Sequence, residues 1–189
     1  MSELLLNNTN VSEKVTISSC IHEMHAGGRS DSLTIRIDDS ESQFDKWGIQ
    51  TGSPVEYRDS GAASGKMYLY SAAPEYGYYI LRAYSMPVSG TIPNTKRWGR
   101  VHFAQIGEEI AARHGLEFES YGLDDIAYQY RAQEKQEDFK FFGQLCTLER
   151  AALIIFDGRL IAAYEPYLES VEPAATIDTA GCVVECEDR

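Results

Sequence analysis

Long apolar runs are missing from this 189-residue sequence: no stretch approaches the roughly 20 apolar residues of a membrane-spanning helix. The N-terminal segment has three consecutive leucines and no basic residues before them, unlike a secretory signal peptide. Basic residues are also scarce, since 17 Lys and Arg stand against 29 Asp and Glu, a formal net charge of −12. This surplus of acid would repel a phosphate backbone or an anionic membrane. We therefore expect neither nucleic acid nor membrane as partner, and a cytoplasmic location where the protein is made.

Cysteines are few, and their spacing argues against two classes of site. The four are Cys20, Cys146, Cys182 and Cys186, which form neither a disulfide framework nor two zinc-binding C-x2-C pairs. Cys182 and Cys186 fall on a predicted strand, where four residues span about 13 Å, too far for a disulfide unless the chain turns. Cys146 falls on the apolar face of a predicted helix and is expected to be a buried thiol. No metal and no cofactor are expected.

Catalytic motifs are missing as well. The sequence has no Gly-x-Ser-x-Gly elbow and no glycine-rich phosphate loop after a strand. His22 and His25 are three residues apart, whereas a zinc-binding helix needs four, and a glycine pair follows, so an exposed loop is expected here. His102 and His114 flank a predicted helix without a serine elbow nearby. The sequence therefore predicts no enzyme and no catalytic, cofactor-binding or metal-binding residues.

The first half of the chain consists of predicted short strands separated by turns. Apolar and polar residues alternate most clearly over 32–38, and strand-like runs also occur at 15–20, 55–58, 66–71 and 78–86. Turn signals separate these runs at intervals of about 8–12 residues, which is typical of a sandwich or barrel. We therefore expect an antiparallel β-barrel-like domain over residues 12–90, after a flexible N-terminus over residues 1–11.

The second half alternates helical and strand patterns. A Gly/Pro loop is expected over 89–94, and apolar residues then recur at helical spacing from Val101 until Gly115 closes the segment. Short strands are expected at 116–119 and 128–131. The strongest hairpin signal follows, because two apolar runs flank Asp157-Gly158, a pair suited to a type I′ turn. The runs of this hairpin are 151–156 and 159–164.

The stretch QEKQEDFKFFGQLC, residues 133–146, combines charge with aromatic residues. Plotted at 100° per residue, one half of a helix here collects the apolar side chains Phe139, Phe141, Phe142, Leu145, Cys146 and Leu148. The acids Glu134, Glu137 and Asp138 precede or open this helix, where their negative charge interacts favourably with the exposed N–H groups of its first turn. The stretch is thus predicted to be a packed helix rather than a reactive site.

These segments resemble, in order, the phage late control protein D family, the tail baseplate hub proteins of contractile-tailed phages and their prophage relatives. Residues 106–118 are similar to the family's helix with an Ala-x-x-His-Gly-Leu ending, and 133–146 to its Gln-x-x-x-Ser-Asp-x-x-Phe-Leu-x-x-Leu-Ala segment. The Asp-Gly-Arg-Leu turn of 157–160 follows at the family's distance. The match is looser over 31–39 and 52–57, and covers roughly residues 10–165. Departures include Glu137 in place of a capping Ser, and Arg150-Ala151 in place of a Gly turn.

The resemblance implies an α+β fold with a structural role. A β-barrel-like hub domain would be followed by an attached helix-strand-helix-hairpin module over residues 95–166. The protein would join tail tube and central spike through protein–protein contacts, as a homotrimer, moving from the bacterial cytoplasm into the tail and baseplate of the virion. Family members usually continue into a second barrel-like domain, which here could only begin within the linker and strand expected over 167–189. A truncated chain and a hub completed by another polypeptide both fit this length.

Three alternatives accompany this reading. A cell-wall hydrolase associated with the baseplate would need Asp124, Asp125 or Glu137 as acid and base, although acidic pairs arise readily among 29 acids. A glycan-binding module would use exposed tyrosines, for which cross-strand packing and a protein interface are the competing roles. The third is the hub of a related contractile injection system. The tyrosines in question are Tyr68, Tyr70, Tyr76, Tyr78, Tyr79 and Tyr84.

Overall fold

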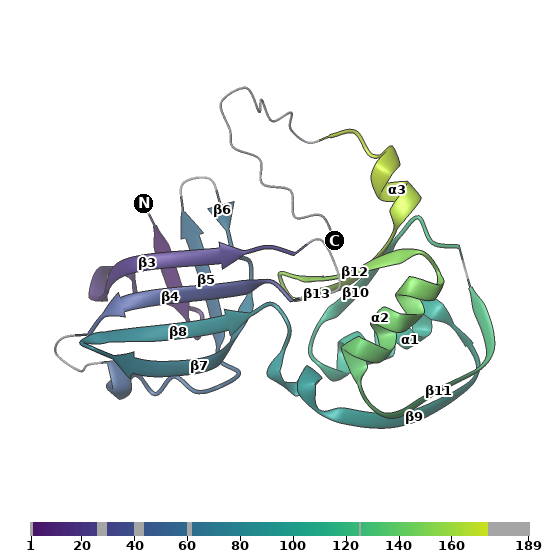
Figure 1. The fold of residues 1–189 in the computed structure, drawn as a ribbon, viewed down its shortest axis with the longest axis horizontal. Coiled ribbons are helices and arrows are strands. Elements are labelled where there is room, and N and C mark those ends of the chain that lie inside the picture. The colour runs from purple at the N-terminus through teal and green to yellow at the C-terminus, as the bar shows by residue number, and fades with distance from the viewer. Residues whose placement is uncertain (1, 26–29, 40–43, 60–61, 125, 174–189) are drawn as a thin grey trace.

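The computed structural model describes residues 2–25, 30–39, 44–59, 62–124 and 126–173 (Figure 1). Two clusters of buried apolar side chains divide these residues into a sheet region, residues 2–86, and a helix region, residues 87–173. Figure 1 shows the sheet region at the left and the helix region at the right. The α+β class expected from the sequence is confirmed.

An antiparallel sheet makes up most of the sheet region, with strands in the order β2-β1-β5-β7-β8-β4-β3 and β6 paired to β5. The strands are β1 (Glu3–Leu6), β2 (Thr9–Asn10), β3 (Thr16–Glu23), β4 (Ser32–Asp38), β5 (Pro54–Asp59), β6 (Ala62–Ala63), β7 (Met67–Glu75) and β8 (Tyr78–Tyr84). Two short 3-10 helices, η1 (Ser12–Lys14) and η2 (Phe44–Trp47), join them. Strand β4 follows the predicted alternation, since Leu33, Ile35 and Ile37 are buried while Arg36 and Asp38 are exposed.

Two expectations for this region are wrong. The barrel does not close, because β2 and β3 end the strand order without pairing to each other in the described part of the chain. Closure depends on register and strand tilt across the whole sheet, which local alternation does not encode. The N-terminus is also not a flexible segment throughout, because Glu3–Leu6 forms β1 against β5, and Leu4 and Leu6 are buried.

The helix region contains two central helices, a short third helix and two small sheets. Its elements are η3 (Val88–Thr91), β9 (Pro93–His102), α1 (Phe103–Arg113), β10 (Glu117–Tyr121), β11 (Ala127–Glu137), α2 (Asp138–Leu148), β12 (Ala151–Phe156), β13 (Arg159–Tyr164) and α3 (Glu165–Ser170). Strands β10, β13 and β12 form one sheet in that order, with β10 parallel to β13. The ribbon of β9 and β11 curves around the two helices (Figure 1).

The β9–β11 ribbon is largely absent from the sequence-based expectations, which placed a loop through Asn94 and a four-residue strand at 128–131. Few of its residues are buried, among them Trp98, Val101 and Tyr128, so the sequence shows little regular alternation along it. The ladder also shifts register between Gln133 and Gln136, where Lys135 takes a left-handed φ of 45°. Such a bulge interrupts the period of two on which strand prediction depends.

The hairpin of β12 and β13 is confirmed at its predicted turn. Asp157 and Gly158 both have positive φ, 49° and 75°, as a type I′ turn requires. The tip of this hairpin meets the sheet region, because the backbone N–H of Lys66 donates to Asp157 Oδ1 at 3.0 Å. The two regions therefore touch at this turn.

Helix α2 buries most of its predicted apolar face. Phe142 is fully buried, with ring centroids 5.0 Å from Phe103 and 5.8 Å from Phe118. Phe141 stacks on Trp98 at 5.4 Å. Leu148 was placed on this face but is 67% exposed, because it is the last helical residue and lies past the end of the core.

The C-terminal expectations are partly wrong and partly outside the described residues. The predicted linker includes the end of α3, a short helix whose first turn contains Pro166, a position that proline suits. The strand expected near the C-terminus, with Cys182 and Cys186, lies outside the described residues. Cys146 is buried as expected.

Candidate functional site

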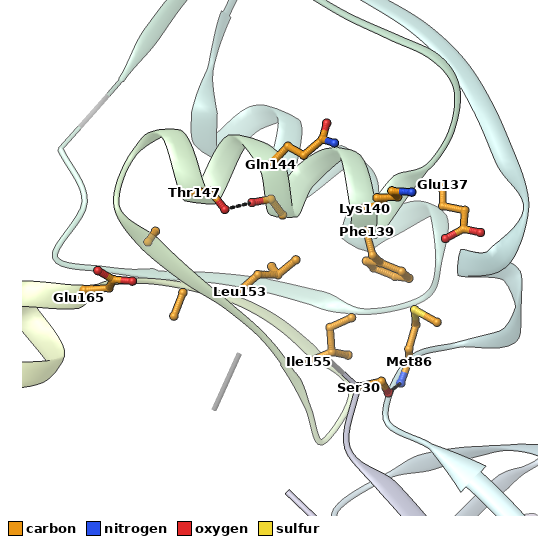
Figure 2. A pocket seen from close by; sticks show the side chains of 13 residues that line it. Ser30, Met86, Glu137, Phe139, Lys140, Gln144, Thr147, Leu153, Ile155 and Glu165 are labelled. Carbon is orange, nitrogen blue, oxygen red and sulfur yellow. Dashed lines mark hydrogen bonds between the residues drawn. The ribbon is translucent and has the colours of Figure 1, made fainter. Parts of the chain in front are cut away.

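A groove of about 650 Å³ lies between α2 and β12 (Figure 2). Its apolar walls include Phe139 from α2 and Leu153 and Ile155 from β12. Ser30 and Met86, at the edge of the sheet region, close one end in Figure 2. The groove thus lies where the two regions meet, which is a common place for a binding site.

The helical wall of the groove follows from residue spacing in α2. Lys140, Gln144 and Thr147 succeed one another at steps of four and three, so they share one exposed stripe of the helix. Gly143 lies in the same stripe and leaves room, because a Cβ built there would come within 3.5 Å of Leu153. Gly143 on α2 and Ala151 on β12 thus contribute little side-chain bulk to the groove.

Acidic groups stand at both ends of the groove. Glu137, the residue before α2, is exposed at one end, and Glu165, the first residue of α3, is exposed at the other (Figure 2). Lys140 is near Glu137 and supplies one positive charge on the rim. The groove is thus apolar along its length and mainly acidic at its ends.

A buried polar cluster joins the ends of the two helices. The carboxylate of Asp138, 1% exposed, accepts hydrogen bonds from Gln133 Nε2 at 2.6 Å and His114 Nε2 at 2.9 Å, and forms an ion pair with Arg113. Burial raises the pKa of Asp138, but the hydrogen bonds from Gln133, His114 and Arg113, with the charge of Arg113, outweigh it and leave that pKa below its ordinary value of 3.8. The cluster therefore holds an ionised carboxylate.

The same cluster includes a serine. Ser89 Oγ is 2.8 Å from His114 Nδ1, so Ser89, His114 and Asp138 have the atom order of a nucleophile, a base and an orienting acid. Two features favour a structural role: Asp138 is also engaged by Arg113 and Gln133, and Ser89 is not among the groove-lining residues. We assign the cluster to tethering η3, α1, β11 and α2 together.

Sequence reasoning missed this cluster. It treated His114 as a helix-flanking residue without a serine and Asp138 as a helix-entry charge, because the three residues are separated by 25 and 24 positions along the chain. A usable signal was present, since a basic Arg113-His114 pair ends one predicted helix and Asp138 opens the next. Opposite charges at those two ends favour contact if the helices pack.

The acids proposed for a cell-wall hydrolase do not form a described pair. Asp124 is exposed in the connection after β10, Glu137 is exposed at the far end of β11, and Asp125 lies outside the described residues. Most of the eleven residues of β11 thus separate Asp124 from Glu137 along the chain. Neither residue has a second described acid among its hydrogen-bond or ion-pair partners.

The tyrosines proposed for glycan binding pack mostly against neighbours. Tyr79 is buried and stacks on Phe44 at 4.4 Å, and Tyr70 meets Tyr84 edge-on at 4.8 Å. Tyr76 is the exception, at 95% exposed on the turn between β7 and β8. Packing against neighbouring aromatic rings therefore accounts for three of the six, Tyr70, Tyr79 and Tyr84. The other two, Tyr68 and Tyr78, are half-buried beside Lys66 and Arg36.

The His22–His25 stretch is only partly a loop. His22 belongs to β3 and is half-buried, while the backbone N–H of His25 donates to Asp31 Oδ1 at 2.8 Å. Within the described ranges, no group of three or more His, Cys, Asp or Glu is placed to hold a metal ion. Among the helices of those ranges, none has the length and hydropathy to cross a membrane.

Comparison of folds finds similar solved proteins in phage tails. A 43 kDa tail protein of prophage MuSo2 from Shewanella oneidensis is similar over 85% of this chain and 53% of its own, with a TM-score of 0.65 and 10% identity. A tail protein from Neisseria meningitidis MC58 is similar over 85% and 49%, with a TM-score of 0.64 and 10% identity. These likenesses establish the fold.

A third similar structure comes from a secretion system. The Escherichia coli c3393 protein, described as a component of the type VI secretion system with structural similarity to the T4 tail proteins gp27 and gp5, has a TM-score of 0.55 and 9% identity. It covers 79% of this chain and 48% of its own. The chain thus spans about half the length of the solved proteins it matches. No protein-family model and no curated protein sequence matches it.

Proposed function

We propose that this protein is a structural component of a phage or prophage tail, of the late control protein D type, located in the baseplate hub between tail tube and spike. The observation that supports this most is the fold match to a prophage tail protein and to a second tail protein, each over 85% of the chain. The residues that suggested the family, in α1, α2 and the β12–β13 turn, occupy core and turn positions of the helix region. The proposed role is non-enzymatic.

The mechanism in this proposal is assembly through protein–protein contacts. The open sheet leaves β2 and β3 at its two ends, and an unpaired strand edge offers backbone N–H and C=O groups to a neighbouring chain. The proposed assembly is a homotrimer that contacts tail tube and spike. Because the matched proteins are about twice as long, a further domain or a second polypeptide would complete the hub.

A related contractile injection system is the second candidate setting. The match to the type VI secretion component supports it, at a lower TM-score of 0.55. The physical role of the chain would be the same in both settings, namely a hub at the end of a tube. The two settings differ in whether particles with heads are made.

Deletion of the gene in its bacterial host tests the proposal. Loss of complete tails after prophage induction, seen by electron microscopy and restored by the gene in trans, is the expected result. Tails of normal length and form in the deletion strain would contradict it. Light scattering on the purified protein measures the oligomer separately, with three times the 21.2 kDa chain mass expected.

A further inference from the structure

Strand β12 has one unpaired edge along the groove. In the part of the chain that the structure describes, β12 pairs with β13 alone. The two-residue turn makes Phe156 and Arg159 a hydrogen-bonded pair, and in an antiparallel ladder such pairs alternate with non-bonded ones. The bonded series therefore runs through Ile154 and Ala152. The hydrogen bond from Glu165 N–H to Arg150 O, at 3.0 Å, extends the same series.

The intervening residues of β12 therefore direct their backbone groups toward the open edge. These are Ala151, Leu153 and Ile155, whose side chains also line the groove. A chain laid along this edge would find three N–H and three C=O groups beside an apolar wall. From Ala151 to Ile155 the edge spans about 13 Å, enough for five residues of an extended partner.

Helix α2 lies over the same edge and sets which side chains fit. An added strand would direct alternate side chains at Phe139 and the space left by Gly143. Addition of an extended peptide to a sheet edge beside a helix is a recurring mode of recognition, in which main-chain bonds give affinity and pockets give specificity. The groove is suited to two aliphatic side chains of moderate size.

The charges at the groove ends define the rest of the partner. Glu137 and Glu165 stand at opposite ends, and the whole chain carries a net charge of −12. Basic residues near both ends of the bound segment would therefore be attracted, and acidic residues repelled. Lys140 offsets part of the attraction near Glu137.

We propose that the groove between α2 and β12 binds an extended segment of a partner protein, added as a strand to β12, with alternating aliphatic residues flanked by Lys or Arg. Strand addition would be one of the protein–protein contacts of the proposed tail role. Only the identity of the partner, as another tail protein, rests on that role. Peptide binding to the purified protein is measured without any tail, so the two can fail separately.

Amide hydrogen exchange with a probe peptide tests the mode of binding. The probe is a capped hexapeptide, Lys-Val-Thr-Val-Thr-Lys, and its matched control has Glu at both ends. At saturation we expect exchange at Leu153 and Ile155 to slow by at least about tenfold, because their N–H groups gain acceptors, and exchange at Ile154 to change far less. Equal slowing at Ile154, no slowing at all, or equal binding of the Glu control would overturn the proposal.

Backbone donors can also be removed singly. Leu153→Pro deletes an outward N–H that β13 does not use, which an edge strand tolerates, whereas Leu153→Ala keeps that N–H and loses only the side chain. We expect the proline variant to weaken binding at least about tenfold and the alanine variant less. If the proline variant fails to fold, a probe methylated on both valine nitrogens keeps the test on the wild-type protein. Unchanged affinity in either experiment would contradict strand addition.

Discussion

The two regions of this protein are stabilised differently. The sheet region has a mainly aliphatic core built on local alternation, with Leu33, Ile35 and Leu81 fully or almost fully buried. The core of the helix region is richer in aromatic side chains, Phe142 among them, and beside it lies the ionised carboxylate of Asp138. Burial of aliphatic side chains is non-directional, whereas stacked rings and a buried charge need partners at fixed positions. The helix region should therefore be the more sensitive to single substitutions and to acid.

Truncation of Phe142 should have the largest effect. Phe142→Ala removes a fully buried ring between Phe103 and Phe118 and should lower the free energy of unfolding by about 3–5 kcal/mol. Urea unfolding measures this, and Leu148→Ala in the same helix, at an exposed position, is the matched control. An unchanged melting temperature for Phe142→Ala would place that ring outside the core.

Neutralising the buried carboxylate of Asp138 should cause the second-largest loss of stability. Asp138→Asn removes the buried charge partner of Arg113, whose guanidinium then keeps only the more exposed Glu109, and should cost about 2–4 kcal/mol. Glu137→Gln, one residue earlier and exposed, is the control and should change stability by less than about 0.5 kcal/mol. Equal effects of the two changes would show that the cluster contributes little.

The pH dependence of stability follows from the same carboxylate. Its pKa is lower in the folded than in the unfolded protein, so its contribution is present above the unfolded value, near 3.8, and is lost as pH falls through the folded value. Thermal unfolding from pH 6 to pH 2 should therefore show a loss of stability below about pH 4 that is smaller in Asp138→Asn. The same acid loss in both proteins would assign it to other carboxylates.

Crowding at the start of the helix region should have a smaller effect. A Cβ at Gly90 would lie 2.1 Å from Phe139 Cε2, so Gly90→Ala must displace the ring and should cost about 1–3 kcal/mol. At Gly99 a Cβ meets no heavy atom within 4 Å, which makes Gly99→Ala the control. Thermal unfolding of both variants measures the difference. Equal melting midpoints would contradict the prediction.

Substitution of Tyr76 should have the smallest effect of all. The ring is 95% exposed on a turn of the sheet region. Tyr76→Asn introduces asparagine, which tolerates the left-handed φ of 50° found there. The free energy of unfolding should stay within about 0.5 kcal/mol of wild type. A larger loss, measured by urea unfolding, would show that the sheet region also depends on a directional aromatic contact.

Sequence reasoning succeeded where a few neighbouring residues in the chain specify the local structure. Alternation placed β4, helical spacing placed α2, and Asp157-Gly158 placed the hairpin turn, because each signal is local. It failed for sheet closure and for the β9–β11 ribbon, which depend on register and on partners far along the chain. The groove was not predicted either, since α2 and β12 were each found but their separation in space was not.

Immunogold labelling of induced particles tests the central proposal most directly. If the protein is a hub component, antibodies against it should label one end of the tail, at the junction of tube and spike, in intact particles. Label spread along the tube, or particles that bind no antibody while the protein remains in the cell extract, would contradict a hub role.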